Sequence, residues 1–156
     1  FYSNIEKKFM INKIFYCNSK NIVFLEDYAY LINTLIDLAD VTLNLKYRLT
    51  ANHLIDEAIN IFYVKEKNIF QKNSLLNNDL FFKPIDISDH TIPNGNSLML
   101  INFARLGKFE EGNKLSNSLN GYLNIYKNYM TSSIKSLDFF NSISSGKKCN
   151  ELGCET

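Results

Sequence analysis

Glycine, proline and cysteine are scarce in this chain, with six, two and three of them in 156 residues. The cysteines stand at Cys17, Cys149 and Cys154, and their odd number and wide spacing provide no disulfide framework. We therefore expect a cytoplasmic protein, the default for a chain without such a framework. The cysteines, His53 and His90 also lack metal-ligand spacing, so we expect no metal and no cofactor.

Neither sign of charge is in excess, because 17 basic residues are scattered among 16 acidic ones and the net charge is +1. Without a basic stripe, nucleic acid and anionic membranes are poor candidates as partners. The longest apolar stretch, residues 28–45, is interrupted by Asn33, Asp37, Asp40 and Asn44, which excludes a membrane span there. The sequence also contains no glycine-rich phosphate loop and no nucleophile elbow.

Apolar residues recur at helical spacing through most of the chain, without a βαβ alternation. This periodicity predicts main helices over residues 27–44, 49–62, 96–106 and 115–126, and shorter helices over residues 2–11 and 130–140. Gly107 is predicted as the C′ residue of the third main helix. Short extended pieces are predicted in the loops, at residues 14–16, 69–71 and 80–83. We therefore predict an all-α domain over residues 1–141, followed by a tail or loop over residues 142–156.

The lengths of the connections indicate how these helices are arranged. Residues 44–47 and 107–109 are tight turns, as expected between antiparallel neighbours, whereas residues 12–25 and 66–93 form long connections. The helices that begin near Asp27 and Asn96 should therefore start at the same end, beside both long loops. Consecutive αα-hairpins of this kind are typical of solenoids and of closed α/α toroids. We expect a functional site on this long-loop face.

Two polar clusters lead into the helices at that end and carry a resemblance to a known family. They are residues 24–32 (FLEDYAYLI) and residues 89–97 (DHTIPNGNS), with the helix 49–62 between them. In this order they resemble the C-terminal α/α toroid of the thioredoxin-domain-containing family that includes the spermatogenesis-associated proteins. The resemblance covers roughly residues 1–140 and implies part of an (α/α)6 toroid. Such toroids are similar in fold to six-hairpin glycosidases and N-acylglucosamine 2-epimerases.

The resemblance mainly implies a fold and the location of a site, and it says little about which reaction occurs there. It covers only part of a toroid, and the chain begins at Phe1. We therefore expect that this chain is a fragment and that the longer parent protein contains the remaining toroid segments. Apolar hairpin faces left without neighbours should then promote self-association. The family's thioredoxin-like module has no counterpart in these residues, so no redox role carries over. The family has a small residue where His90 stands and a serine where Asn94 stands, so His90 is not implied as catalytic.

Asp27 and Asp89 are the candidate catalytic residues, since both should lie on the rim of the predicted site. Two carboxylates that flank a bound sugar are what glycosidic cleavage requires. Alternatively, Asp27 complements the dipole in the first turn of its helix, and Asp89 braces its loop through local backbone hydrogen bonds. His90, beside Asp89, is a further candidate as an oriented base of the kind used in sugar epimerisation.

The residues around these groups are candidates for substrate binding. Tyr28, together with Phe24 and Tyr30, offers an aromatic platform for a sugar ring, or alternatively packs in the core. The turn over residues 93–97 offers free helix N–H groups and amide side chains to a polar ligand, or alternatively only caps a helix. The predicted substrate-binding set is Tyr28, Pro93, Asn94, Gly95, Asn96 and Ser97.

Two functions therefore stay open. The first is a carbohydrate-binding or carbohydrate-processing domain, glycosidase- or epimerase-like, with a polar pocket for a small sugar ligand on the long-loop face. The second is a non-enzymatic helical scaffold or interaction domain. The geometry of the carboxylates of Asp27 and Asp89 discriminates between them. If both line one concave pocket, the enzyme is favoured; if they cap separate helices, the scaffold is favoured.

Overall fold

The computed structural model describes residues 24–74, 84–85, 87–146, 149–150 and 153–154. The α-helices among them are α2 (Leu25–Thr42), α3 (Leu45–Phe62), α4 (Gly95–Leu106), α5 (Phe109–Tyr126) and α6 (Thr131–Ser144), with a 3-10 turn η1 (Lys127–Tyr129) before α6. Two short antiparallel hairpins accompany them, β1 (Tyr63–Val64) with β2 (Ile69–Phe70), and β3 (Cys149–Asn150) with β4 (Gly153–Cys154). The all-α fold class is confirmed.

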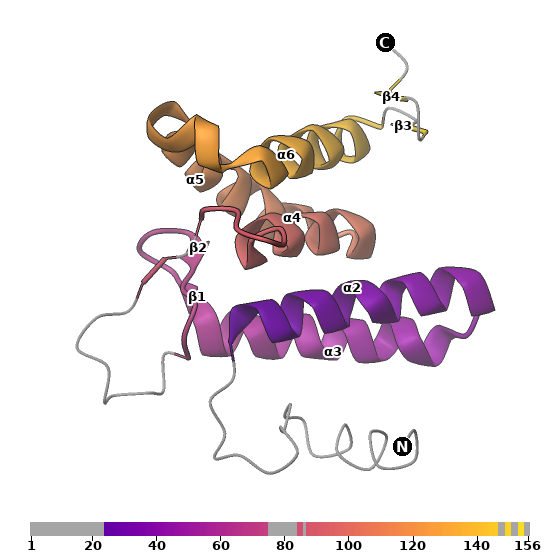
Figure 1. Cartoon of the computed structure of the whole chain (residues 1–156). Helices are drawn as coiled ribbons and strands as arrows, with labels where there is room; N and C mark the ends of the chain where they lie inside the picture. Colours follow the sequence, from indigo (N-terminus) through magenta and orange to yellow (C-terminus); the bar gives the residue numbers. More distant parts are fainter. Residues whose placement is uncertain (1–23, 75–83, 86, 147–148, 151–152, 155–156) are drawn as a thin grey trace.

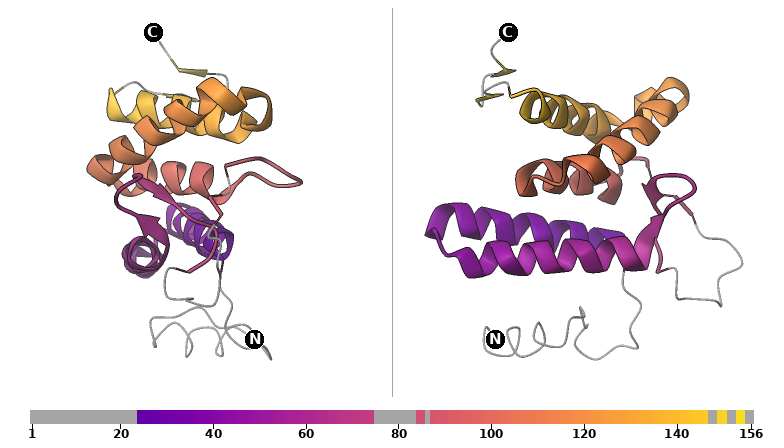
Figure 2. Two further views of the ribbon diagram at one scale, coloured as in Figure 1. Left: turned by 90° about the vertical axis from the view of Figure 1, so that its left-hand side faces the viewer. Right: turned by 180° about the vertical axis from the view of Figure 1, so that it is seen from behind.

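The helices form a stack, in which the α2–α3 hairpin lies on one side of α4 and α6 lies on the other (Figures 1 and 2). α5 packs against both α4 and α6. α3 runs back along α2, and α5 turns back from α4 after Gly107. At the other end, the space for a side chain at Gly95 is filled by Leu25, since a Cβ there would lie 2.8 Å from the Leu25 Cδ2 atom. The starts of α2 and α4 therefore lie side by side, as the loop lengths predict.

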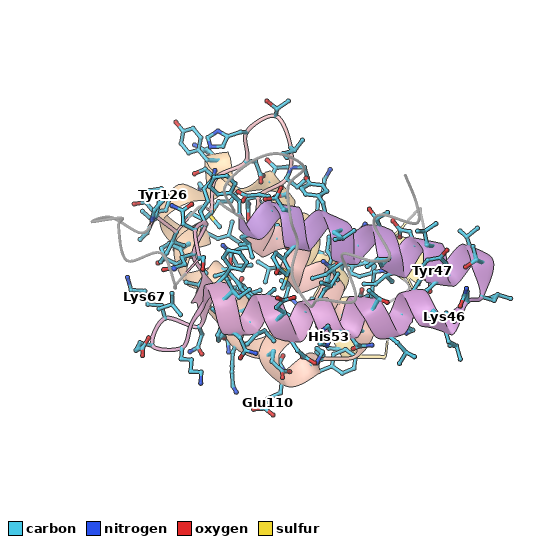
Figure 3. All side chains as sticks on the ribbon, turned by 90° about the horizontal axis from the view of Figure 1, so that it is seen from below. Lys46, Tyr47, His53, Lys67, Glu110 and Tyr126 are labelled. Carbon is cyan, nitrogen blue, oxygen red and sulfur yellow. The ribbon has the colours of Figure 1, made fainter. Side chains whose placement is uncertain are left out.

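Each helix of the α2–α3 hairpin buries one apolar stripe, which explains why these segments are helical. On α2 the buried positions follow the i, i+4, i+7, i+8 spacing and are Leu25, Tyr28, Ala29, Ile32, Leu35, Ile36 and Ala39. On α3 they are Ala51, Leu54, Ile55, Ala58 and Phe62. The exposed His53 lies on the outer side of α3 (Figure 3). Burial of each large apolar side chain stabilises this pair by about 1.5–3 kcal/mol.

α4 is the central helix, packed between α2 and α6, and it is buried on almost every side. Its one deeply buried amide near the C-terminus, Asn102, donates from Nδ2 to the carbonyl oxygen of Ala29 at 2.9 Å and so joins α4 to α2. The helix ends as predicted at Gly107, which has a φ of 75°. A side chain there would strain this left-handed backbone, which glycine adopts freely.

The structure corrects several predicted boundaries. α3 begins at Leu45 and α5 at Phe109, both earlier than the apolar spacing indicates, because their first turns are largely exposed. α6 continues to Ser144, so the predicted tail begins within a helix; the Ser142 hydroxyl donates to the Phe139 carbonyl, which accommodates this polar turn in the helix. Farther on, strands β3 and β4 pair antiparallel, and in their register the backbone of Cys149 lies opposite that of Cys154.

The extended piece predicted at residues 69–71 corresponds to β2, but its partner β1 was not predicted. No local pattern indicates β1, because Tyr63 and Val64 directly follow the apolar residues of α3 in the sequence. The helix predicted over residues 2–11 and the extended pieces at 14–16 and 80–83 lie outside the described residues.

Candidate functional site

The start of α4 is built by the turn that the sequence singles out. Asn94 is the N-cap residue, with extended backbone (φ −68°, ψ 154°), and its Oδ1 accepts a hydrogen bond from the Ser97 N–H at 3.0 Å. This bond satisfies one of the free N–H groups in the first turn. Pro93 precedes it, and its carbonyl oxygen accepts from the Tyr30 hydroxyl at 3.1 Å. The turn thereby fastens α4 to α2.

Asp27 holds the start of its own helix. Its Oδ2 atom accepts a hydrogen bond from the Phe24 N–H at 2.9 Å, while its N–H donates to the Phe24 carbonyl at 3.2 Å. The Leu25 N–H is bound separately, by the carbonyl of Lys72 at 2.9 Å. The Asp27 carboxylate is therefore an acceptor for the backbone that enters α2, and it also lies near the dipole's positive end.

Asp89 caps a different helix. Its Oδ2 accepts from the Ser132 N–H in the first turn of α6 at 2.6 Å, and its Oδ1 accepts from the Ser132 hydroxyl. The backbone N–H and side-chain Nδ2 of Asn94 donate to Oδ1 as well, at 3.2 and 2.9 Å. The Asp89 N–H in turn donates to the Tyr129 carbonyl at 2.8 Å. One carboxylate thus connects the start of α6 to the start of α4.

These contacts determine the charge of Asp89. Partial burial raises the pKa of Asp89, but the hydrogen bonds from Ser132 and Asn94 together outweigh burial and lower the pKa below its ordinary value. Asp89 is therefore ionised at neutral pH. Burial, together with the negative charges of Asp89 and Glu26, raises the pKa of Tyr30, so that this phenol keeps its proton and donates to Pro93.

A buried chain of hydroxyl groups extends this network between α4 and α6. The Ser97 Oγ lies 3.1 Å from the Asn94 Oδ1, 3.0 Å from the Ser132 Oγ and 2.8 Å from the Ser133 Oγ. Ser97 and Ser133 are almost fully buried. Within the described part of the chain no histidine joins this network, because His90 is exposed and His53 lies on α3. The serines therefore lack the imidazole base that activates a nucleophilic hydroxyl.

An open cleft of about 350 Å³ lies where α2 and α4 begin. Its lining comprises Phe24, Glu26, Asp27, Lys72, Ser88, His90, Ile92, Pro93 and Asn94. The cleft brings together four residues of the predicted site, Asp27, His90, Pro93 and Asn94, but Asp89 does not line it. Glu26 and Lys72 were not predicted; the Glu26 Oε1 lies 3.5 Å from the Lys72 Nζ. The other carboxylate oxygen, Oε2, is buried and has no hydrogen-bond partner within the described residues.

Several predicted binding residues face away from this cleft. Tyr28 is 1% exposed, and its ring meets Phe62 edge to face in the core, with 5.4 Å between ring centres. Asn96 is fully buried; its Oδ1 accepts from the Phe70 N–H at 3.0 Å and its Nδ2 donates to the Phe70 carbonyl at 2.9 Å. Gly95 is pressed against Leu25. These residues join the helices to one another and to β2.

The residues that sequence reasoning missed are the partners of these groups. Ser132 and Ser133 stand in a Thr-Ser-Ser run before the apolar stripe of α6, a composition typical of helix starts. That signal identifies a helix terminus but not the distant carboxylate that caps it. Lys72 enters the cleft from the segment after β2, and no local pattern indicates its position.

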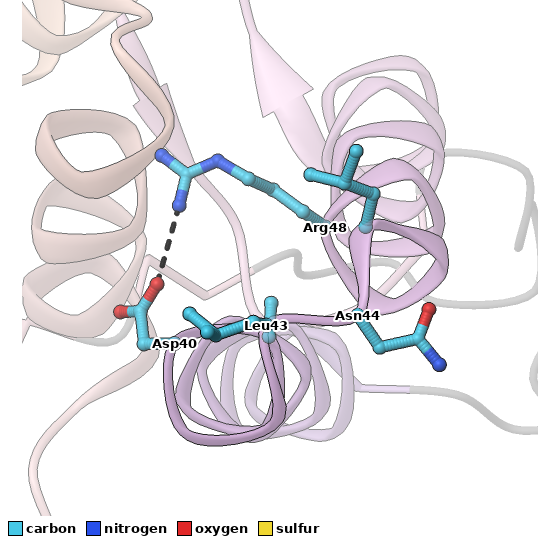
Figure 4. A pocket seen from close by; sticks show the side chains of 6 residues that line it. Asp40, Leu43, Asn44 and Arg48 are labelled. Atoms are coloured by element: carbon cyan, nitrogen blue, oxygen red, sulfur yellow. Dashed lines mark hydrogen bonds and ion pairs between the residues drawn. The ribbon is translucent and has the colours of Figure 1, made fainter.

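The opposite end of the hairpin has a second, smaller cleft of about 280 Å³ (Figure 4). It is lined by Ala39, Asp40, Leu43, Asn44, Leu45 and Arg48. The Arg48 Nη1 lies 3.4 Å from the Asp40 Oδ1, and its Nη2 donates to the Arg105 carbonyl at 2.6 Å. Arg105 itself forms ion pairs with Asp37 at 2.6 Å and with Asp40 at 2.8 Å.

The described residues show neither a metal centre nor a membrane span. The described residues contain no cluster of three or more histidine, cysteine or acidic side chains placed to hold a metal ion. None of the helices in the described ranges combines the length and the apolar character needed to span a bilayer. No protein-family model matches the chain, and no curated protein matches its sequence.

Proposed function

We propose that this chain is a helical scaffold or interaction module, in which the polar clusters fix the relative positions of helices instead of performing catalysis. The observation that carries this proposal is the use of the two candidate carboxylates. Asp27 caps the start of α2 and Asp89 caps the start of α6. Only Asp27 lines the cleft. Glycosidic cleavage requires two carboxylates directed at the same sugar.

The electrostatics of Asp89 argue against its use as the general acid of a glycosidase. A general acid must hold a proton at neutral pH, which requires a raised pKa. The hydrogen bonds from Ser132 and Asn94 lower the pKa of Asp89 instead. Turning the carboxylate toward a substrate would also break its four hydrogen bonds to these two residues.

The arrangement of the helices supports a repeat architecture for this scaffold. α2, α4 and α6 all begin at one end, and each of α2 and α4 is followed by a returning helix. We propose on this basis, together with the resemblance of residues 24–32 and 89–97, that the hairpins belong to an (α/α)6 toroid. A longer chain would supply the remaining hairpins.

A second candidate function is the binding of a small hydroxyl-rich molecule of the carbohydrate class in the 350 Å³ cleft. The observation that favours it is the buried Glu26 Oε2, which lacks a hydrogen-bond partner within the described residues. A buried carboxylate oxygen without a donor is costly, and a sugar hydroxyl would satisfy it. His90 and Lys72 line the same cleft and offer further polar contacts.

One experiment separates the two candidates. The melting temperature is measured with a panel of aldoses, amino sugars and sugar phosphates, for the unmodified chain, for Glu26→Gln, and for Glu66→Gln as a control at an exposed position. The scaffold proposal predicts no saturable change with any compound. A saturable rise that Glu26→Gln abolishes and Glu66→Gln retains would contradict it and support the binding cleft.

A further inference from the structure

The turn between α2 and α3 exposes a group of leucines. Leu43 and Leu45 are 84% and 72% exposed and line the 280 Å³ cleft, while Leu49, one turn after Leu45 on α3, is 69% exposed. We call Leu43, Leu45 and Leu49 the hairpin-tip patch. Single exposed leucines are ordinary, but three close together in the sequence, two of them lining a cleft, indicate an interaction surface.

Leu43 has an unusual backbone for its residue type. Its φ of 55° and ψ of 20° place it in the left-handed region at the C-terminal cap of α2. Glycine or asparagine is the usual residue there, and a leucine costs roughly 1 kcal/mol. The Leu43 side chain is almost fully exposed, so burial within the single chain does little to offset this cost. Burial against another molecule would recover it.

The patch is complementary to itself. It presents a projecting side chain, Leu43, beside an open cleft whose wall includes Ala39 and Leu45 (Figure 4). Cavities of about 150 Å³ hold a benzene molecule, so a cleft of about 280 Å³ has room for the four-carbon side chain of leucine. A two-fold contact between identical chains uses the same patch on both copies, and a projection beside a recess makes such a patch self-complementary.

The charges at the rim fit the same partner. Asp40 and Arg48 lie on the wall of the cleft, 3.4 Å apart, with 52% and 40% of their side chains exposed. Both signs of charge are therefore present side by side. In a two-fold contact Arg48 of each copy can face Asp40 of the other, so that no like charges are brought together. A partner with charges of one sign would lack this match.

We propose that the hairpin-tip patch is a homodimer interface, in which Leu43 of each copy fills the cleft of the other. Two substitutions test this interface without harming the fold of the single chain. Leu43→Gly removes the projection and suits the positive φ. Leu45→Glu places a charge in the interface, at the first residue of α3, where an acidic side chain favours the helix dipole.

The test is sedimentation equilibrium of the full chain over a range of concentrations, with melting temperatures measured in parallel. Ile125→Glu is the matched control, because Ile125 is 71% exposed on α5 and outside the patch. We expect a dimer whose dissociation constant rises at least about a hundred-fold in Leu43→Gly and in Leu45→Glu. Their melting temperatures should be equal or higher at low concentration, and Ile125→Glu should dimerise like the unmodified chain.

Three outcomes would overturn the proposal. The first is an unmodified chain that stays monomeric at the highest concentration it tolerates. The second is a dimer that persists unchanged in both patch variants. The third is a dimer that Ile125→Glu disrupts as strongly as the patch variants, which would indicate general apolar association and not this interface.

Discussion

Where α2, α4 and α6 begin, polar side chains are buried and hydrogen-bonded, with Asn94, Ser97 and Ser133 at 3% exposure or less. The α2–α3 turn has the opposite composition. Its leucines are exposed, and its charged side chains form ion pairs close to solvent. Buried hydrogen bonds are costly to break, whereas exposed ion pairs contribute little. The end where α2, α4 and α6 begin therefore holds the helices together. The end with the α2–α3 turn remains available to a partner.

The sharpest test of this difference is Asp89→Ala. Removing the carboxylate leaves the backbone N–H groups of Ser132 and Asn94 without their acceptor, while the Asn94 Nδ2 keeps the Ile87 carbonyl at 3.0 Å. The free energy of unfolding should fall by about 3 kcal/mol. Urea denaturation measures the change. Asp138→Ala removes an exposed aspartate from the same helix α6 and should change stability by less than about 0.5 kcal/mol. Equal effects of the two substitutions would mean that Asp89 is not a structural cap.

A second test concerns the buried amide of Asn96. Asn96→Ala leaves the N–H and carbonyl of Phe70 without their side-chain partner in a buried position, so we expect a loss of about 2 kcal/mol. Chemical denaturation again gives the value. Asn113→Ala, at an exposed position of α5, is the control and should be close to neutral. If Asn96→Ala were equally mild, the link between α4 and β2 would carry no stability.

Acid should lower the free energy of unfolding, because protonation of Asp89 weakens its hydrogen bonds where α4 and α6 begin. Since the folded-state pKa of Asp89 is lowered, its contribution is fully present above the unfolded pKa of about 4 and is lost as the pH falls through the folded pKa. Stability measured from neutral pH downward should therefore fall less steeply below about pH 4 in Asp89→Asn than in the unmodified chain. Identical slopes in this range would show that Asp89 is not coupled to folding.

The smallest effect is expected at the other end. Asp40→Asn weakens ion pairs with Arg48 and Arg105, but Asp40 is half exposed and Arg105 keeps Asp37 at 2.6 Å. The free energy of unfolding should fall by about 0.5 kcal/mol, and the difference should shrink further at high salt. A loss as large as that of Asp89→Ala, measured under the same conditions, would remove the contrast between the two ends.

The sequence predicted the local features of this molecule better than its long-range ones. Periodicity located the helices, and glycine chemistry identified Gly107 as the end of α4, because both signals are contained within a few residues. The helix cap at Asn94 follows from the same kind of local signal, the polar turn over residues 93–97. Asp89 binds the nearby Asn94, but its other partner, Ser132, is 43 positions away. The partner of Asn96, Phe70, is 26 positions away. No pattern along the chain joins such pairs, since packing of the helices brings them together.

Asn96 also has a consequence for how the small β1–β2 sheet meets other chains. Phe70 lies opposite Tyr63 in the hairpin, and Asn96 binds both its N–H and its carbonyl on the side away from β1. The amide side chain thus takes the place of one residue of a neighbouring strand. An open strand edge invites edge-to-edge aggregation. At Phe70 this edge is already occupied from within the molecule.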